Sequence, residues 1–241
     1  MKDKHLVIKN TTLVKCYDQF ETVVVPEGVE EIDSYAFGQC ENLKEVILPS
    51  TLNNIDTAAF YGCKKLEKIN LPSSLKEITI PKGIKTINPS TFSGCESLTN
   101  VYLPASIKTI GAHAFYGCLD LKTINLENVE HLENHAFTYT HLDSIVFDKI
   151  KSIDIFSIDA SKLNYIWFRC IPENIDENFL SADPDITKIK ISKENYTKLP
   201  KFLTKQFSDR ILITDNSLED LIEEKKTLKE VNTYLSHIEE R

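Results

Sequence analysis

The chain has 241 residues, of which 41% are hydrophobic and 27% are charged, a composition that supports a sizeable folded core. Its formal net charge of −8 argues against general nucleic-acid binding, which needs a basic face. No run approaches the roughly 18 apolar residues that a membrane span requires. The first residues show no long apolar segment and no signal-peptide cleavage site, so we expect a cytoplasmic protein without membrane insertion.

The first elements in chain order belong to an internal repeat, which an incomplete copy opens at Phe20. Four cysteines step by 23, 32 and 23 residues, and each follows a phenylalanine by three positions. The pairs are Phe37 with Cys40, Phe60 with Cys63, Phe92 with Cys95 and Phe115 with Cys118. Several markers that hold one phase predict a stack of similar structural units.

Each unit also carries a strand motif of the form L-x-x-L-x-L. The clearest copy is LKEVILP at Leu43, and it recurs at Leu66, Leu75, Leu98 and Leu121. Apolar residues alternate in the last part of each copy, as a strand buried on one face requires. The step from Leu66 to Leu75 is only 9 residues, and we interpret it as a fusion in which the second half of one repeat starts the next.

Later copies are less regular. Phe137 keeps the aromatic position while Thr140 replaces the cysteine, and the strand motif returns at Leu142 and Leu163. Fainter candidates follow at Ile186 and near Ile213. The pattern LxxLxLPxSLxxIxxxAFxxC resembles the BspA-like leucine-rich repeats of bacteria, which have a period of 23 residues.

The resemblance implies an α/β solenoid, a leucine-rich-repeat horseshoe of stacked parallel strands with degenerate C-terminal capping repeats and a terminal amphipathic helix. We expect the solenoid over residues 1–215, with the best-matched repeats over 20–168 and the degenerate cap over 169–215. For many members the resemblance also implies a surface or host-facing role, including adhesion to host proteins. Cell-surface or secreted localisation is therefore the alternative to the cytoplasm.

The repeated cysteines favour packing over chemistry. There is no C-x-x-C pair, and a free cysteine behaves as a small buried hydrophobe. Thr140 in the same slot fits a core position but would not serve as a nucleophile or thiolate ligand. Cys16 and Cys170 lie outside this spacing, and their positions stay unassigned.

Histidines are the other candidates for chemistry. His113 and His135 share one repeat slot and should lie on adjacent coils, with His131 and His141 close in sequence. A metal cluster is a hypothesis, because imidazole suits zinc, copper or nickel. Solvated edge histidines are the alternative that we favour. No nucleotide-binding or catalytic motif is present, so we expect no enzyme and no cofactor or metal.

Outward-facing strand residues are the candidate binding surface. The third and fifth positions of the motif should line the concave face, because the leucines point inward. We predict that five of them bind a protein or peptide ligand: Tyr102, Asn125, Val146, Tyr165 and Trp167. The alternative for Trp167, the single tryptophan, is that the C-terminal region covers it and that it caps the core.

Charge is distributed unevenly toward the C-terminus, and the last residues have a helical pattern. Residues 125–185 carry 12 acidic and 4 basic residues, whereas residues 186–213 carry 7 basic and 2 acidic ones. A gradient of this kind orients a charged partner. Residues 216–241 should form an amphipathic helix with leucines at Leu221, Leu228 and Leu235. It either caps the last repeat or, in an alternative scaffold function, drives oligomerisation, so we expect a monomer or weak homo-oligomer.

Overall fold

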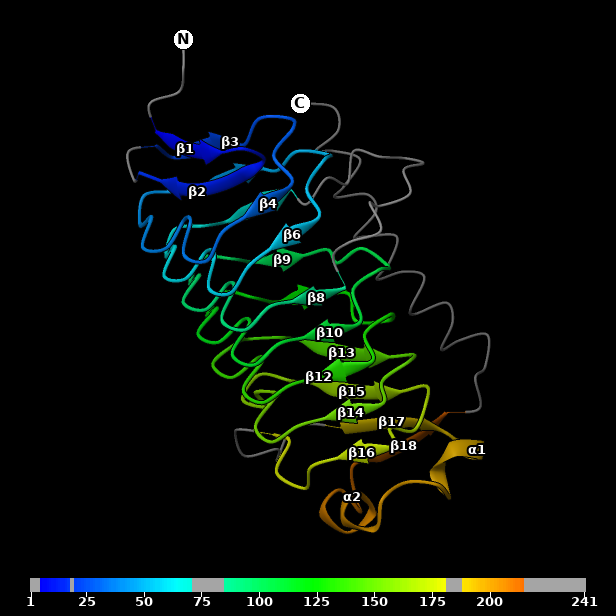
Figure 1. Cartoon of the computed structure of the whole chain (residues 1–241). Helices are drawn as coiled ribbons and strands as arrows, with labels where there is room; N and C mark the ends of the chain where they lie inside the picture. The colour runs from blue at the N-terminus through cyan, green and yellow to red at the C-terminus, as the bar shows by residue number, and fades with distance from the viewer. Residues whose placement is uncertain (1–4, 18–19, 71–84, 181–187, 215–241) are drawn as a thin grey trace, which may run out of the picture.

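A computed structural model describes residues 5–17, 20–70, 85–180 and 188–214, and within this part the chain winds as a solenoid of stacked coils (Figure 1). Each full coil has three sides, two of which carry short strands. The L-x-x-L-x-L motifs form the side that we call the first sheet. Its strands are β3 (Thr22–Val24), β5 (Glu45–Ile47), β7 (Lys68–Asn70), β9 (Asn100–Val101), β11 (Thr123–Ile124), β13 (Ser144–Phe147), β15 (Tyr165–Phe168), β17 (Lys188–Ser192) and β18 (Ile211–Thr214).

In each repeat a second short strand forms at an apolar pair after the first-sheet strand, such as Val29 and Ile32, and the sequence did not predict it; the N-terminal hairpin extends the same side. We call these strands the second sheet. They are β1 (Leu6–Lys9), β2 (Thr12–Cys16), β4 (Glu31–Ile32), β6 (Asn54–Ile55), β8 (Thr86–Ile87), β10 (Thr109–Ile110), β12 (His131–Leu132), β14 (Ser152–Ile153) and β16 (Asn174–Ile175). Coil-to-coil pairing is parallel in both sheets, and only the N-terminal hairpin β1–β2 is antiparallel. The stacked parallel strands of the expected solenoid are thus confirmed.

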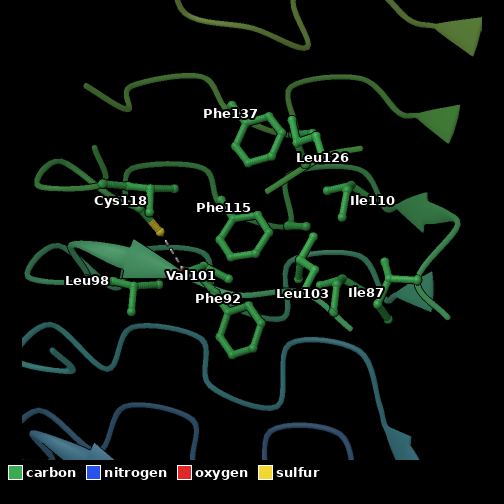
Figure 2. Packing of buried hydrophobic residues seen from close by; sticks show 14 of the residues in the cluster. Ile87, Phe92, Leu98, Val101, Leu103, Ile110, Phe115, Cys118, Leu126 and Phe137 are labelled. Atoms are coloured by element: carbon green, nitrogen blue, oxygen red, sulfur yellow. Dashed lines mark hydrogen bonds between the residues drawn. The ribbon is translucent and has the colours of Figure 1, made fainter. Parts of the chain in front are cut away.

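The third side of each coil, which we call the turn edge, contains the Ala-Phe segment and holds the core together. Phenylalanine rings stack beneath it from coil to coil, as Figure 2 shows for three of them. Their centroids are 4.7 Å apart for Phe37 and Phe60, and 5.3 Å for Phe115 and Phe137. All are buried, so each ring covers its neighbour from water. The turn edge carries turns and no helix, and the only described helices follow Ser192.

The cysteine column lies beside these rings and is buried, as the sequence predicts. Cys63, Cys95 and Cys118 are 0% exposed. Each thiol also donates a hydrogen bond to the phenylalanine carbonyl of the preceding coil, at 3.1 to 3.3 Å. Burial raises the pKa of Cys95 and Cys118, so both remain thiols at neutral pH. The column therefore contributes packing and inter-coil bonds.

Cys16 occupies the phenylalanine slot of the first coil. Its backbone N–H donates to the carbonyl of Ala36 at 2.7 Å, just as that of Phe37 donates to Ala59 at 2.8 Å. Its carbonyl accepts from the Cys40 thiol at 3.8 Å. The spacing rule missed this position because the aromatic marker is absent from the first coil.

Cys63 and Cys95 are 32 residues apart in the sequence but lie on adjacent coils. Phe60 and Phe92 stack at 5.4 Å, and the N–H of Phe60 donates to the carbonyl of Thr91 at 2.9 Å. The two coils therefore stack directly. The Leu75 motif and the proposed fusion fall in residues 71–84, which lie outside the described residues.

Two short helices, α1 (Lys193–Tyr196) and α2 (Lys201–Gln206), lie between the last two strands of the first sheet. The side chain of Ser192 caps α1 by accepting the N–H of Asn195 at 3.3 Å. Leu203 and Phe207 are buried against the end of the core. The expected helix over 216–241 lies outside the described residues, and the boundary at 215 stays a prediction.

Candidate partner-binding face

The five predicted binding residues belong to the first sheet, where they are distributed in two groups. Val146, Tyr165 and Trp167 come together on the paired strands β13 and β15, in which Val146 lies opposite Trp167. Tyr102 and Asn125 follow β9 and β11 on earlier coils. Four of the five are half-buried, and Trp167 is the most buried at 6% exposure.

Two cations lie over the aromatic pair of β15. The Arg169 guanidinium carbon is 4.3 Å from the Trp167 ring centroid, and Lys190 Nζ lies 5.6 Å from the same ring. Lys190 Nζ is closer to the Tyr165 ring, at 4.3 Å. These are cation–π distances, and they explain part of the burial of Trp167. We call Tyr165, Trp167, Arg169 and Lys190 the cation–aromatic cluster.

Sequence reasoning missed Arg169 and did not link Lys190 to the rings. Register supplies the link, because Lys190 on β17 lies directly opposite Trp167. Arg169 follows β15 and also forms an ion pair with Asp148 at 3.3 Å. The cluster therefore combines Trp, Tyr and Arg, which are enriched at protein interfaces, with a lysine.

Asn125 has a structural task that the sequence did not suggest. Its side-chain amide donates to the carbonyl of Leu103 at 2.9 Å and accepts from the Leu103 N–H at 2.6 Å. These two bonds extend the pairing of β9 and β11 beyond their last residues. Asn125 thus holds neighbouring coils together, and the cluster on β15 and β17 is the better candidate for an anchor.

The outer face of the second sheet differs in character, because its polar side chains bond one another. Glu130 pairs with Lys151 at 2.6 Å and with Lys108 at 3.5 Å. The hydrogen bond from Lys151 lowers the pKa of Glu130. On the neighbouring strands His131 Nδ1 lies 2.8 Å from Ser152 Oγ. The described strands of this face contain no Trp, Tyr or Phe.

The histidines that suggested a metal cluster are arranged as stacked rings. His113 and His135 do lie on adjacent coils, but their rings stack with centroids 4.9 Å apart. Burial, with a smaller effect from His135, lowers the pKa of His113. Within the described residues, no three or more His, Cys, Asp or Glu side chains are grouped to hold a metal ion. All six cysteines are free thiols.

Six copies of the BspA type leucine rich repeat match the chain, over residues 7–79 and 73–187. The chain belongs to this family. The match includes both strand sides and the turn edge of the described coils up to β16, while β17, β18 and the two helices follow it. Proteins of this family are repeat proteins that generally bind other proteins.

The chain is similar to several solved bacterial structures. The pneumococcal vaccine antigen PcpA is 21% identical with a TM-score of 0.50, covering 87% of this chain and 45% of that one. A leucine-rich cell surface protein of Faecalibacterium prausnitzii is 25% identical over 72% of this chain and 36% of its own, with a TM-score of 0.48. The leucine-rich repeat protein of T. pallidum is 22% identical, with coverages of 87% and 94% and a TM-score of 0.48.

The chain spans less than half the length of the first two of these proteins. The comparison with curated proteins gave no match. Neither helix of the described residues, α1 or α2, has the length and apolar character needed to cross a membrane.

Proposed function

We propose that this chain is a non-catalytic module that binds a protein or peptide through the outer face of the first sheet. The cation–aromatic cluster carries the proposal. It combines Trp, Tyr and Arg, the side chains most often found as binding anchors, on one rigid pair of strands. Rigid placement lowers the entropy lost on binding.

The chemistry of the cluster favours a partner segment that bears carboxylates. Lys188 is exposed and lies opposite Tyr165, so it adds a third cation beside Arg169 and Lys190. Residues 125–185 carry 12 acidic and 4 basic residues, whereas residues 186–213 carry 7 basic and 2 acidic ones, so the partner would be oriented along the sheet with its acidic end toward β17. Val146 would supply the neighbouring apolar contact, and Tyr102 a further one on an earlier coil.

The single tryptophan is a built-in reporter for a test. Titration with peptides rich in Asp and Glu, against counterparts with Asn and Gln, should change Trp167 fluorescence only for the acidic set. Salt should weaken the binding, because exposed charges are screened. Lys190→Ala should reduce affinity by about tenfold, as expected when a binding anchor is truncated. Lys205→Ala on α2 is the matched control and should leave it unchanged.

Two results would contradict the proposal. If acidic and neutral peptides bind equally, the charge argument is wrong. If Trp167→Ala unfolds the protein, the ring belongs to the core and the binding anchor must be Tyr165 or a residue on another coil. Circular dichroism of Trp167→Ala separates these cases from a simple loss of affinity.

We extend the proposal to the setting of this binding. The resemblance to the family implies adhesion or another host-facing role, whereas the sequence alone predicts the cytoplasm. Protease treatment of intact cells that express the natural protein distinguishes the two, because only a surface-exposed chain is cleaved. The alternative scaffold function rests on residues 216–241, which lie outside the described part, and no observation favours it.

A further inference from the structure

A second candidate binding site lies on the turn edge, away from the first sheet. It is a groove of about 370 Å³ that crosses several coils. Three columns of residues line it, at the first, second and fourth positions after the buried phenylalanines. They are Tyr61, Ser93 and Tyr116; Gly62, Gly94 and Gly117; and Lys64, Glu96 and Leu119. Gln39 and Tyr139 occupy the two ends of the glycine column.

The glycine column forms the floor of this groove, and backbone conformation explains why. Every residue at this position has a positive φ, from 59° at Tyr139 to 74° at Gly94. Glycine adopts that conformation without strain. A Cβ on Gly94 would lie 3.5 Å from the Cα of Gly62, so the glycines are stacked directly on one another. The result is a glycine strip between columns of larger residues, bounded at Gly62 by the Gln39 side chain, whose Nε2 lies 2.6 Å from where a Cβ on Gly62 would be.

The floor offers no backbone N–H to a ligand. The N–H groups of Gly62, Gly94 and Gly117 donate to carbonyls of the next coil at 2.7 to 2.9 Å. A peptide therefore cannot add to the floor as a β-strand through these groups, and a phosphate would find no donors there. Recognition must rely on ring packing and on the tyrosine hydroxyls.

The tyrosines form a widely spaced series. Tyr61 and Tyr116 are two coils apart, with the buried Ser93 between them, so small residues separate two large rings. Each coil advances about 5 Å, as the Phe60–Phe92 and Phe92–Phe115 centroid distances of 5.4 and 5.2 Å show. Tyr116 continues into Tyr139, at 5.2 Å in an edge-to-face pair.

We propose that this groove binds a proline-rich peptide in the polyproline II conformation, with a basic residue beside the prolines. One polyproline turn has three residues and advances about 9 Å, close to the separation of Tyr61 and Tyr116 by two coils. Prolines three residues apart would then meet equivalent tyrosine edges. Proline has no N–H and needs no acceptor from the groove, while its carbonyls can accept from tyrosine hydroxyls.

Charge at the groove explains the basic residue. Lys64 pairs with Glu41 at 3.7 Å. Glu96 lines the groove and has no ion pair within the part of the chain that the structure describes. An arginine or lysine of the peptide would complement Glu96. Burial raises the pKa of Tyr116, and so do the charge and the side-chain hydrogen bond of the neighbouring Tyr139.

The test uses calorimetric titration of the full chain with the peptide Arg-Pro-Leu-Pro-Pro-Leu-Pro. Its counterpart, with alanine at every proline, should bind at least about tenfold more weakly, because it lacks the preformed helix. Tyr116→Ala should reduce affinity for the proline peptide by a similar factor. Tyr17→Ala is the control, since Tyr17 is 54% exposed and lies outside the groove.

A second variant guards against misfolding. Gly94→Asn fills the floor, and asparagine tolerates a positive φ better than most residues. It should abolish binding while the melting temperature stays close to that of the natural chain. Glu96→Gln should weaken binding of the arginine peptide but not of a peptide with glutamine in its place.

Three outcomes would overturn this proposal. The first is that the alanine peptide binds as well as the proline peptide. The second is that the Gly94→Asn variant binds the proline peptide normally. The third is that the groove binds cellohexaose and no peptide, which would make it a glycan site. Lys190→Ala should leave binding of the proline peptide unchanged. A failure here is thereby separate from a failure of the proposed first-sheet function.

Discussion

The coils before and after Phe137 fill the same interior with aromatic side chains in different places. In the earlier coils the largest side chain is the phenylalanine under the turn edge, and the last inward position of the first-sheet motif is leucine at Leu48, Leu103 and Leu126. In the later coils Ile158 and Leu180 pair in line with Phe137. There the last motif position holds Phe147 and Phe168, stacked at 5.7 Å.

This exchange shows how a solenoid preserves its packing. A protein interior is close-packed, so a smaller side chain on one side of a coil needs a larger one elsewhere. Each coil contacts only its neighbours, so the compensation must occur within the same or the adjacent coil. The phenylalanine column and the Phe147–Phe168 pair are thus two solutions to one volume requirement.

Removing a ring from the earlier column should have the largest effect. Phe92 is 1% exposed and stacks on rings above and below it. Phe92→Ala should lower the free energy of unfolding by about 3–5 kcal/mol through lost burial and a cavity. Chemical denaturation measures it. If the two arrangements are equivalent, Phe168→Ala causes a similar loss of stability in the later coils. A loss below about 1 kcal/mol for either variant would contradict that equivalence.

Adding a ring to the later coils should have the next largest effect. Ile158→Phe extends the earlier column, but Phe147 and Phe168 already take that volume, so the variant should lose about 1–3 kcal/mol by overpacking. The double variant Ile158→Phe with Phe168→Leu copies the earlier arrangement and should recover part of that loss. Additive effects of the two changes would show that the two positions do not compensate each other.

The repeat interior could be predicted because identical side chains recur in identical surroundings. The spacing of Phe37, Phe60, Phe92 and Phe115 alone places the rings in one column, and Thr140 could be assigned to the core from its slot. The strands of the second sheet were missed because two residues, as in β4, are too few to show an alternation. Cys16 was missed because no phenylalanine precedes it.

The candidate surfaces could be predicted only in part. Position in the motif identifies Tyr165 and Trp167 as outward residues, but the cations over them come from β17 and from the residue after β15. Contacts of that kind depend on register between coils. The turn-edge groove was missed for a similar reason, since Gly94 looks like an ordinary turn glycine until Gly62 and Gly117 are stacked on either side.

The cysteine slot should show a smaller and more specific effect. Cys63→Ser should lose about 1–3 kcal/mol, because a buried hydroxyl loses hydration and a shorter side chain reaches the Phe37 carbonyl poorly. Thr140→Val should lose only about 1 kcal/mol, the value of one hydrogen bond, since the Thr140 hydroxyl bonds the Phe137 carbonyl of its own coil. Chemical denaturation gives the change in the free energy of unfolding for both variants, provided that their unfolding free energies depend on denaturant concentration with the same slope as that of the natural chain.

Cys63→Ala is the control for this slot, because Ala160 is fully buried in a later coil and its carbonyl accepts from the Leu163 N–H as that of Cys63 accepts from the Leu66 N–H. The alanine side chain is a methyl group without a hydroxyl, so this variant measures the lost volume and the lost thiol hydrogen bond alone. Equal stability of Cys63→Ser and the natural chain would show that the slot is not as dry as its 0% exposure indicates.

The smallest expected effect on stability comes from protonation of the stacked histidine rings. His113 and His135 stack as the phenylalanines do, but burial and His135 lower the pKa of His113. The unfolded chain then binds a proton more readily than the folded one. This contribution to stability is therefore present above the ordinary histidine pKa and is lost as the pH falls through that value toward the lower folded one.

Melting temperatures at several pH values between about 5 and 8 would test this, in the range where histidine titrates. His113→Gln should flatten the decline toward acid pH, whereas His141→Gln, at an exposed position outside the stack, should leave it unchanged. A decline that is the same in all three proteins would mean that the stack tolerates protonation. In that case two identical rings on adjacent coils would stack stably at the turn edge even when they are charged, as the neutral phenylalanine rings do in the core.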